Sequence, residues 1–288
     1  MRAINKPTHD SLTVYQQCID SISDNGLRHR LNQIAGSIGT AARDYEQKAN
    51  SQLLYTIVSN TCRNDELALG GVTKEELRNV YSSHMVVKTK PARAIYDSLL
   101  SLAPLGRCPF CGCGYATTLD HYLPKAKYPQ FSVLPLNLVP ACKDCNKDKL
   151  AIDSTTAEGQ SLHPYFDHEN FINQQWLYAE VIETAPATMS FFVSAPDDWD
   201  EISKARVQRH FNDFNLASRY SIEAGTQLAC LRDSLIMQFD TLGLDWVRKL
   251  LEIEAEAYAK NHVNSWQTAM YQALSGSVWY HQGGFQLA

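Results

Sequence analysis

Residues 119–149 read LDHYLPKAKYPQFSVLPLNLVPACKDCNKDK, and CPFCGCG stands just upstream at residues 108–114. Together they contain two CxxC pairs, Cys108 with Cys111 and Cys142 with Cys145. Two such turns supply four thiolates, which are enough for a closed tetrahedral zinc site. The pairs therefore predict a structural Zn²⁺ that ties both ends of the segment together. Since the segment has little apolar material of its own, zinc binding would supply much of its folding free energy.

The chain has eight cysteines, so four stand outside the two pairs. Cys113 directly follows the first pair and is predicted to be an ordinary thiol beside the site, although it could replace Cys111 as a ligand. We expect Cys18, Cys62 and Cys230 to lie on the apolar faces of helices and to be core residues.

Polar residues stand at intervals inside this cysteine-bounded loop: Asp120 and His121 together, then Asn137, then Asn146 directly after the last cysteine. In this order the motifs CPFCG, LDHYLPK, YPQFS, PLNLVPAC and CNKDK resemble the HNH endonucleases, whose fold is the ββα-metal fold. The resemblance covers about residues 107–150. More narrowly, the segment is similar to the HNH nucleases of retron and Septu-type bacterial anti-phage systems, which commonly work beside an ATPase subunit.

The resemblance implies a role for each of these residues. His121 would be the general base, Asn137 would orient it, and Asn146 would stand in place of the final His of the family motif. Neutral imidazole is suited to take a proton from water near pH 7. An amide carbonyl that accepts the other ring N–H would fix the tautomer, which is the task expected of Asn137. Asp120 and Asn146 would hold a catalytic Mg²⁺ or Mn²⁺, since both ions prefer oxygen ligands.

The charge distribution adds candidate contacts to nucleic acid. Residues 107–149 contain six Lys and Arg against three Asp, in a chain with a net charge of −5. A local basic excess suits phosphate contacts, although it can also arise by chance. Lys125, Lys147 and Lys149 are the candidates, and they would position the nucleic acid without reading its sequence.

Two further residues are weaker candidates. Asp144 could join the cation site, since it lies two residues before Asn146. His163, in LHPYFD, could belong to the site, but a His before Pro in a loop is more often structural.

The remaining sequence predicts an α+β protein in which a small ββα-metal module lies between two mainly helical lobes. The predicted domains are a helical lobe over 1–104, the HNH module over 105–170 and a C-terminal lobe over 171–288. Helical spacing runs through residues 10–60, Thr73 is a predicted N-cap, and Pro91 is expected in the first turn of another helix. LYAEVIET and TMSFFVSA predict a β-hairpin that is followed by helices. No long apolar run or secretory signal is present, so a cytoplasmic location and no membrane contact are expected.

The sequence thus favours a divalent-metal-dependent endonuclease that hydrolyses phosphodiester bonds in DNA, as the effector of an anti-phage system. Two alternatives stay open. One is a catalytically inactive, zinc-stapled module that binds nucleic acid or a partner, and the other is an HNH nuclease that cleaves RNA or tRNA. The helical lobes could dock an ATPase subunit, an expectation that rests on the resemblance alone.

Overall fold

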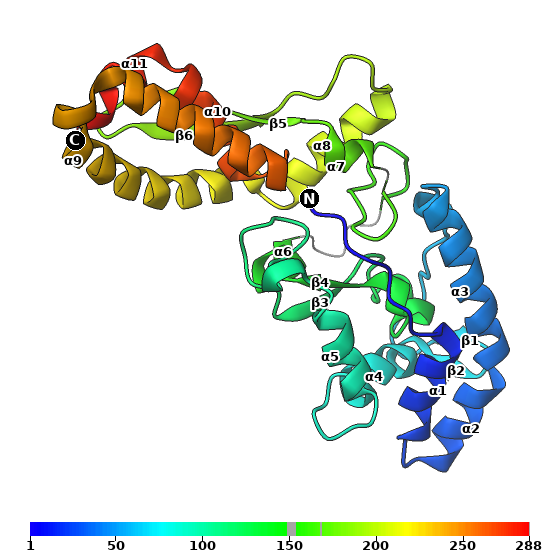
Figure 1. Ribbon diagram of the computed structural model, residues 1–288. Coiled ribbons are helices and arrows are strands. Elements are labelled where there is room, and N and C mark those ends of the chain that lie inside the picture. The colour runs from blue at the N-terminus through cyan, green and yellow to red at the C-terminus, as the bar shows by residue number, and fades with distance from the viewer. Residues whose placement is uncertain (149–153, 168, 288) are drawn as a thin grey trace. The chain divides into compact units, whose positions relative to one another are not determined.

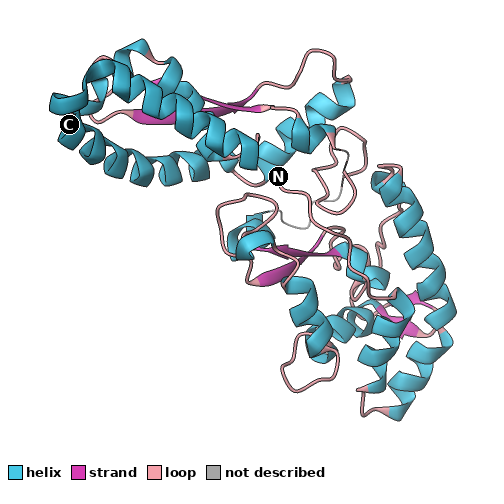
Figure 2. Ribbon diagram, in the orientation of Figure 1, coloured by secondary structure: helices cyan, strands magenta, loops and turns pink. Residues whose placement is uncertain are grey.

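The computed structural model describes residues 1–148, 154–167 and 169–287 (Figure 1). The chain forms two compact units: an N-terminal unit, Arg2–Asp167, and a C-terminal unit, His168–Ala288 together with Met1. Helices and short antiparallel hairpins make up both units, which agrees with the predicted α+β class (Figure 2). The N-terminal unit combines the predicted helical lobe with the segment that carries the CxxC pairs.

Three helices fill most of the first fifty residues, where the sequence shows helical spacing. Asp10 caps the first of them by accepting a hydrogen bond from the Thr13 amide at 2.8 Å. Asp24 caps the second by accepting one from the Leu27 amide at 3.0 Å. The helices are α1 (Ser11–Asp20), α2 (Asn25–Gln33) and α3 (Ala35–Asn50), with the short turn η1 (Leu54–Thr56) after them.

A small ribbon, β1 (Leu67–Leu69) with β2 (Val72–Thr73), leads into α4 (Lys74–His84). Thr73 caps α4 as predicted, and it forms a reciprocal capping box with Glu76. α5 (Arg93–Leu100) begins later than predicted, since Ala92 is its N-cap and Pro91 lies outside the helix.

The segment with the CxxC pairs is a hairpin followed by a helix. β3 (Thr118–His121) pairs antiparallel with β4 (Leu138–Ala141), so that His121 lies opposite Leu138 and Thr118 opposite Ala141. Leu119, Val133 and Leu138 belong to the same buried cluster as residues of α1, α4 and α5. The hairpin and the helices therefore share one core, which fixes the hairpin against the helical part. The short elements around the strands are η2 (Pro104–Gly106), η3 (Pro129–Phe131), η4 (Pro135–Asn137) and α6 (Lys143–Asp148).

The C-terminal unit contains the predicted hairpin, β5 (Leu177–Ile182) with β6 (Thr188–Val193). This hairpin packs against the long helix α9 (Leu216–Asn261) and the shorter helix α10 (Trp266–Gly276), and Tyr280 and Phe285 of the chain's last segment are buried in the same unit. The longest helix is interrupted at Gly243, whose φ of 72° favours glycine. The helices of the C-terminal unit are α7 (Asn170–Asn173), α8 (Glu201–Asp213), α9 (Leu216–Asn261), α10 (Trp266–Gly276) and α11 (Val278–His281), with η5 (Gly284–Gln286) at the end.

Among the described helices, none combines the length and the apolar character that crossing a membrane requires.

Candidate metal centre and adjoining polar site

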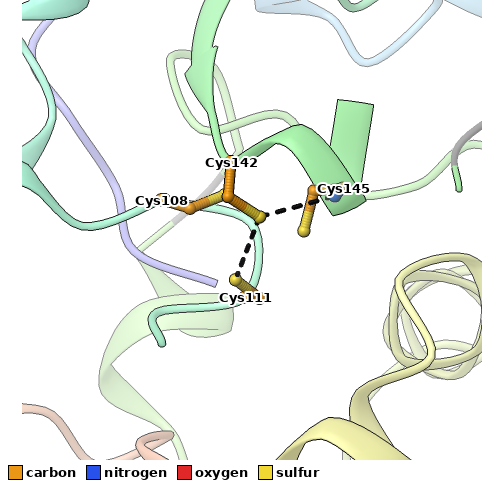
Figure 3. A group of neighbouring side chains, drawn as sticks. All are labelled: Cys108, Cys111, Cys142 and Cys145. Atoms are coloured by element: carbon orange, nitrogen blue, oxygen red, sulfur yellow. Dashed lines mark hydrogen bonds between the residues drawn. The ribbon is translucent and has the colours of Figure 1, made fainter. Parts of the chain in front are cut away.

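The two predicted CxxC pairs meet in one buried cluster. The Sγ atoms of Cys108, Cys111, Cys142 and Cys145 all lie within 4.8 Å of one another (Figure 3). Tetrahedral zinc with Zn–S bonds of about 2.3 Å would hold its sulfurs about 3.8 Å apart. Cys111 Sγ and Cys142 Sγ are 3.9 Å apart. The cluster is therefore suited to hold one zinc-sized ion, and it brings the turn before β3 to the start of α6.

Backbone amides orient the sulfurs of this cluster. The Gly114 amide donates to Cys111 Sγ and the Cys145 amide donates to Cys142 Sγ, each at 3.4 Å. Gly114 has no room for a side chain, because an added Cβ would lie 2.8 Å from both Cβ and Sγ of Cys142. The first turn also needs Gly112, whose φ of 74° lies in the left-handed region. These backbone features help to bring the four thiols together.

The electrostatics of the cluster favour a bound cation. A hydrogen bond from the Cys108 thiol lowers the pKa of Cys111 well below its usual range. Four sulfurs at this distance cannot all carry a negative charge unless a cation compensates them. A divalent ion would therefore stabilise the deprotonated cluster and, with it, both ends of the ββα segment.

The other cysteines lie outside the four-sulfur cluster. Cys113 is partly buried beside the first pair, and Cys18 is buried as predicted. The core prediction is wrong for Cys62 and Cys230. Cys62 lies in a loop and is partly exposed, and Cys230 is on the solvent side of α9.

His121 ends strand β3 with 9% of its surface exposed. Its Nε2 atom lies 2.8 Å from the Ser132 carbonyl oxygen. A carbonyl can only accept, so Nε2 carries the proton, and the lone pair of the neutral ring is on Nδ1. The ring also packs edge-on against Tyr81, with 4.4 Å between centroids. The imidazole is thus held in one orientation and one tautomer.

Asn137 does not make the predicted bond to the His121 ring. Its side chain is fully buried and reaches back to the loop between the strands. Oδ1 accepts from the Leu123 amide at 2.7 Å, and Nδ2 donates to the Leu123 and Phe131 carbonyls at 3.0 and 3.3 Å. Ser132, whose carbonyl holds the ring, directly follows Phe131. Asn137 therefore shapes the loop that positions His121, and it acts on the ring indirectly.

A second layer of polar residues supports Asn137. The Tyr45 hydroxyl on α3 lies 3.1 Å from Asn137 Oδ1 and 3.2 Å from His163 Nε2. His163 is 1% exposed, and its Nδ1 accepts from the Tyr165 amide, so Nε2 carries the proton. Its ring stacks on Tyr122 at 4.0 Å. His163 thus lies behind Asn137 in the packed interior, and Tyr45 is a contributor that the sequence did not reveal.

Asn146 joins α6 to the first strand. Its Nδ2 donates to Thr118 Oγ1 at 2.7 Å, which turns the nitrogen of the amide toward β3. Asp120 lies two residues beyond Thr118, on the same face of the strand, and is 5% exposed. Asp120 also acts on Tyr81 of α4. Burial raises the pKa of the Tyr81 hydroxyl, and the charges of Tyr96 and Asp120 raise it further, so this hydroxyl stays protonated. The Asp120 carboxylate and the Asn146 amide oxygen are donors of the kind that Mg²⁺ and Mn²⁺ prefer.

The lysines predicted to contact phosphate differ in how exposed they are. Lys147 and Asp144 are exposed on α6, while Lys149 lies outside the described residues. Lys125 is partly buried, with Nζ 4.5 Å from the centre of the Tyr81 ring. Tyr81 also contacts His121, so Lys125 is the lysine that the structure links to the imidazole.

The fold and the cluster define the class: an α+β protein with a hairpin–helix segment whose ends meet at a cluster of four cysteines that could hold a metal ion. The chain is 36% identical over 229 residues to protein ea31 of Escherichia phage lambda, an alignment that covers 75% of this chain and 77% of that protein. The chain belongs to the family of phage lambda protein ea31. No protein-family model and no solved structure matches it.

Proposed function

We propose that the protein is a metal-dependent endonuclease of the HNH type that hydrolyses phosphodiester bonds in DNA. One observation carries the proposal: His121, at the end of the first strand, donates Nε2–H to the Ser132 carbonyl at 2.8 Å. This bond leaves Nδ1 as the basic atom in a strand–strand–helix segment whose ends meet at the cysteine cluster. The neighbouring residue in the strand, Asp120, supplies a buried carboxylate, and Asn146 on α6 is tied to the same strand through Thr118.

The residues of the chain divide the chemistry as follows. His121 Nδ1 would take a proton from the attacking water, since neutral imidazole is basic enough near pH 7. Ser132 fixes the tautomer of that ring, and Asn137 holds the loop that contains Ser132. Asp120 and Asn146 would hold a divalent cation, which would polarise the phosphate and stabilise the leaving oxygen. The four sulfurs would close the coordination of zinc, so that ion would be structural.

Backbone contacts would position the substrate without reading its sequence. Exposed Lys147 on α6 and Lys125 beside Tyr81 are suited to this role. DNA is proposed as the substrate by resemblance to HNH nucleases. The anti-phage role and the ATPase subunit stay predictions from the same resemblance.

The test incubates the zinc-loaded protein with supercoiled plasmid, single-stranded DNA and RNA. Mg²⁺ or Mn²⁺ should start cleavage of DNA and EDTA should stop it. A reaction with added Zn²⁺ alone is the control, because it keeps the structural ion but supplies no oxygen-preferring cation. Salt-sensitive binding with no cleavage under any divalent ion would instead identify a binding module, and cleavage of RNA alone would reassign the substrate.

A further inference from the structure

Tyr81 links the His121 ring to a cation from the loop between the strands. The Tyr81 and His121 ring centroids are 4.4 Å apart, and Lys125 Nζ lies 4.5 Å from the Tyr81 centroid. Tyr81 is on α4, in the helical part of the N-terminal unit. One aromatic ring thus separates the ammonium group from the proposed general base.

A second cation reaches the same place from α4. Arg78 precedes Tyr81 by three residues, so both side chains lie on one face of the helix. Burial, and then the charge of Arg78, lower the pKa of Lys125, so the two cations act on each other. Two like charges that repel each other in this way are unfavourable unless an anion compensates them.

Neither Arg78 nor Lys125 forms an ion pair with a carboxylate among the described residues. Arg78 Nη1 donates to Asn64 Oδ1 at 2.9 Å, which fixes the guanidinium. Its Nε is buried and has no hydrogen-bond partner within the described residues. The Arg78 guanidinium is therefore held in one orientation, while its Nε–H group has no acceptor within the described residues.

We propose that Arg78 and Lys125 together bind a backbone phosphate of nucleic acid beside His121. A guanidinium offers a planar fork of donors that matches phosphate oxygens, and the ammonium adds a compact charge. The inference rests on the proposed function, which it deepens by giving the helical part a substrate-positioning residue. Arg78 lies outside residues 107–150, so the HNH-like segment would depend on α4 to hold its substrate. Since phosphates carry no base identity, these contacts would not select a sequence.

The experiment measures binding of a fluorescein-labelled duplex at several salt concentrations, with all proteins carrying His121→Ala to prevent cleavage. Arg78→Met and Lys125→Met each remove one cation while keeping much of the side-chain volume. Lys88→Met and Arg43→Met are matched controls, because both residues are exposed and neither is part of the site. Each site variant should lower the slope of log K against log [salt] by about 1, whereas the controls should leave it unchanged.

A structural role alone would give a different pattern. Slopes of Arg78→Met and Lys125→Met equal to those of the controls would overturn the proposal, even if their melting temperatures fell. If Arg78→Met does not fold, Arg78→Lys replaces it: the slope should stay near that of the parent while affinity falls, since the charge remains and the fork is lost. Equal affinity of Arg78→Lys and the parent would count against the guanidinium.

The outcome also separates this inference from the proposed function. If the protein with intact His121 cleaves DNA but the slopes do not change, only the phosphate site is wrong. If the slopes change as expected but no divalent ion supports cleavage, the phosphate site stands and the nuclease assignment fails.

Discussion

Replacing Asn137 by aspartate tests the part of the site that positions His121. The two side chains have nearly the same shape, but aspartate has an oxygen in place of the donor Nδ2. Two hydrogen bonds are lost, at 3.0 Å to the Leu123 carbonyl and at 3.3 Å to the Phe131 carbonyl. The bond from the Leu123 amide to Oδ1, at 2.7 Å, can persist. The change therefore removes the donor side of the amide and places an ionisable carboxyl in a fully buried position.

The expected magnitude follows from these contacts. Each lost bond costs about 1 kcal/mol, and the two buried carbonyls left facing an oxygen add about 1–3 kcal/mol in total. Opening of the loop should become easier by about 3–5 kcal/mol, which is roughly a 100- to 5000-fold larger opening equilibrium. Cleavage should slow in parallel, because the Ser132 carbonyl no longer holds the ring in one place.

The assay is hydrogen–deuterium exchange of peptides that cover residues 122–137. Asn5→Asp is the control, since it makes the same chemical change at an exposed position of the same unit. All five tryptophans lie in the C-terminal unit, so fluorescence-detected unfolding of that unit should be unaffected. If the loop in Asn137→Asp exchanged as slowly as in Asn5→Asp, the reasoning about the amide would be refuted.

Three further predictions concern the four-cysteine cluster and the residues around the polar site. Cys108→Ser should abolish zinc binding, as measured by metal analysis, and unfold both turns locally. Cys230→Ser is the control and should keep its zinc. Full zinc content in Cys108→Ser would remove Cys108 from the ligand set. Gly114→Ala should weaken zinc affinity by about tenfold or more, because its Cβ would lie 2.8 Å from Cys142 Sγ, and competition with a chelator measures this. Tyr45→Phe should cost about 1 kcal/mol of stability in the N-terminal unit, seen as faster amide exchange, through loss of the hydroxyl contacts to Asn137 and His163. Unchanged exchange in that variant would show that these contacts contribute nothing.

The features that could be predicted from the sequence are those that short sequence motifs determine locally. The CxxC spacing predicted the cysteine cluster, Thr73 predicted the start of α4, and the two β-prone runs predicted the hairpin of the C-terminal unit. Each of these depends on a short motif with its own physical preference, which explains why it could be predicted without a structure.

Contacts between distant segments could not be predicted in this way. The partner of the His121 ring is a backbone carbonyl, and a carbonyl at Ser132 has no signature in the sequence. Tyr45 reaches His163 across 118 residues, and only the packing of α3 against the loop brings them together. Arg78 on α4 could not be linked to Lys125 for the same reason. Cys230 was misplaced because a long helix with a broad polar face offers no clear apolar side at that position.

The most direct test of the central claim compares the initial nicking rate of supercoiled plasmid by the wild-type protein and by His121→Ala, with Mn²⁺ and at equal zinc content. A positioned general base contributes about 100- to 10 000-fold, so the rate of the variant should fall by at least about 100-fold while its zinc and fold persist. Equal rates for the two proteins would contradict the assignment of His121 as the base and, with it, the proposed nuclease site.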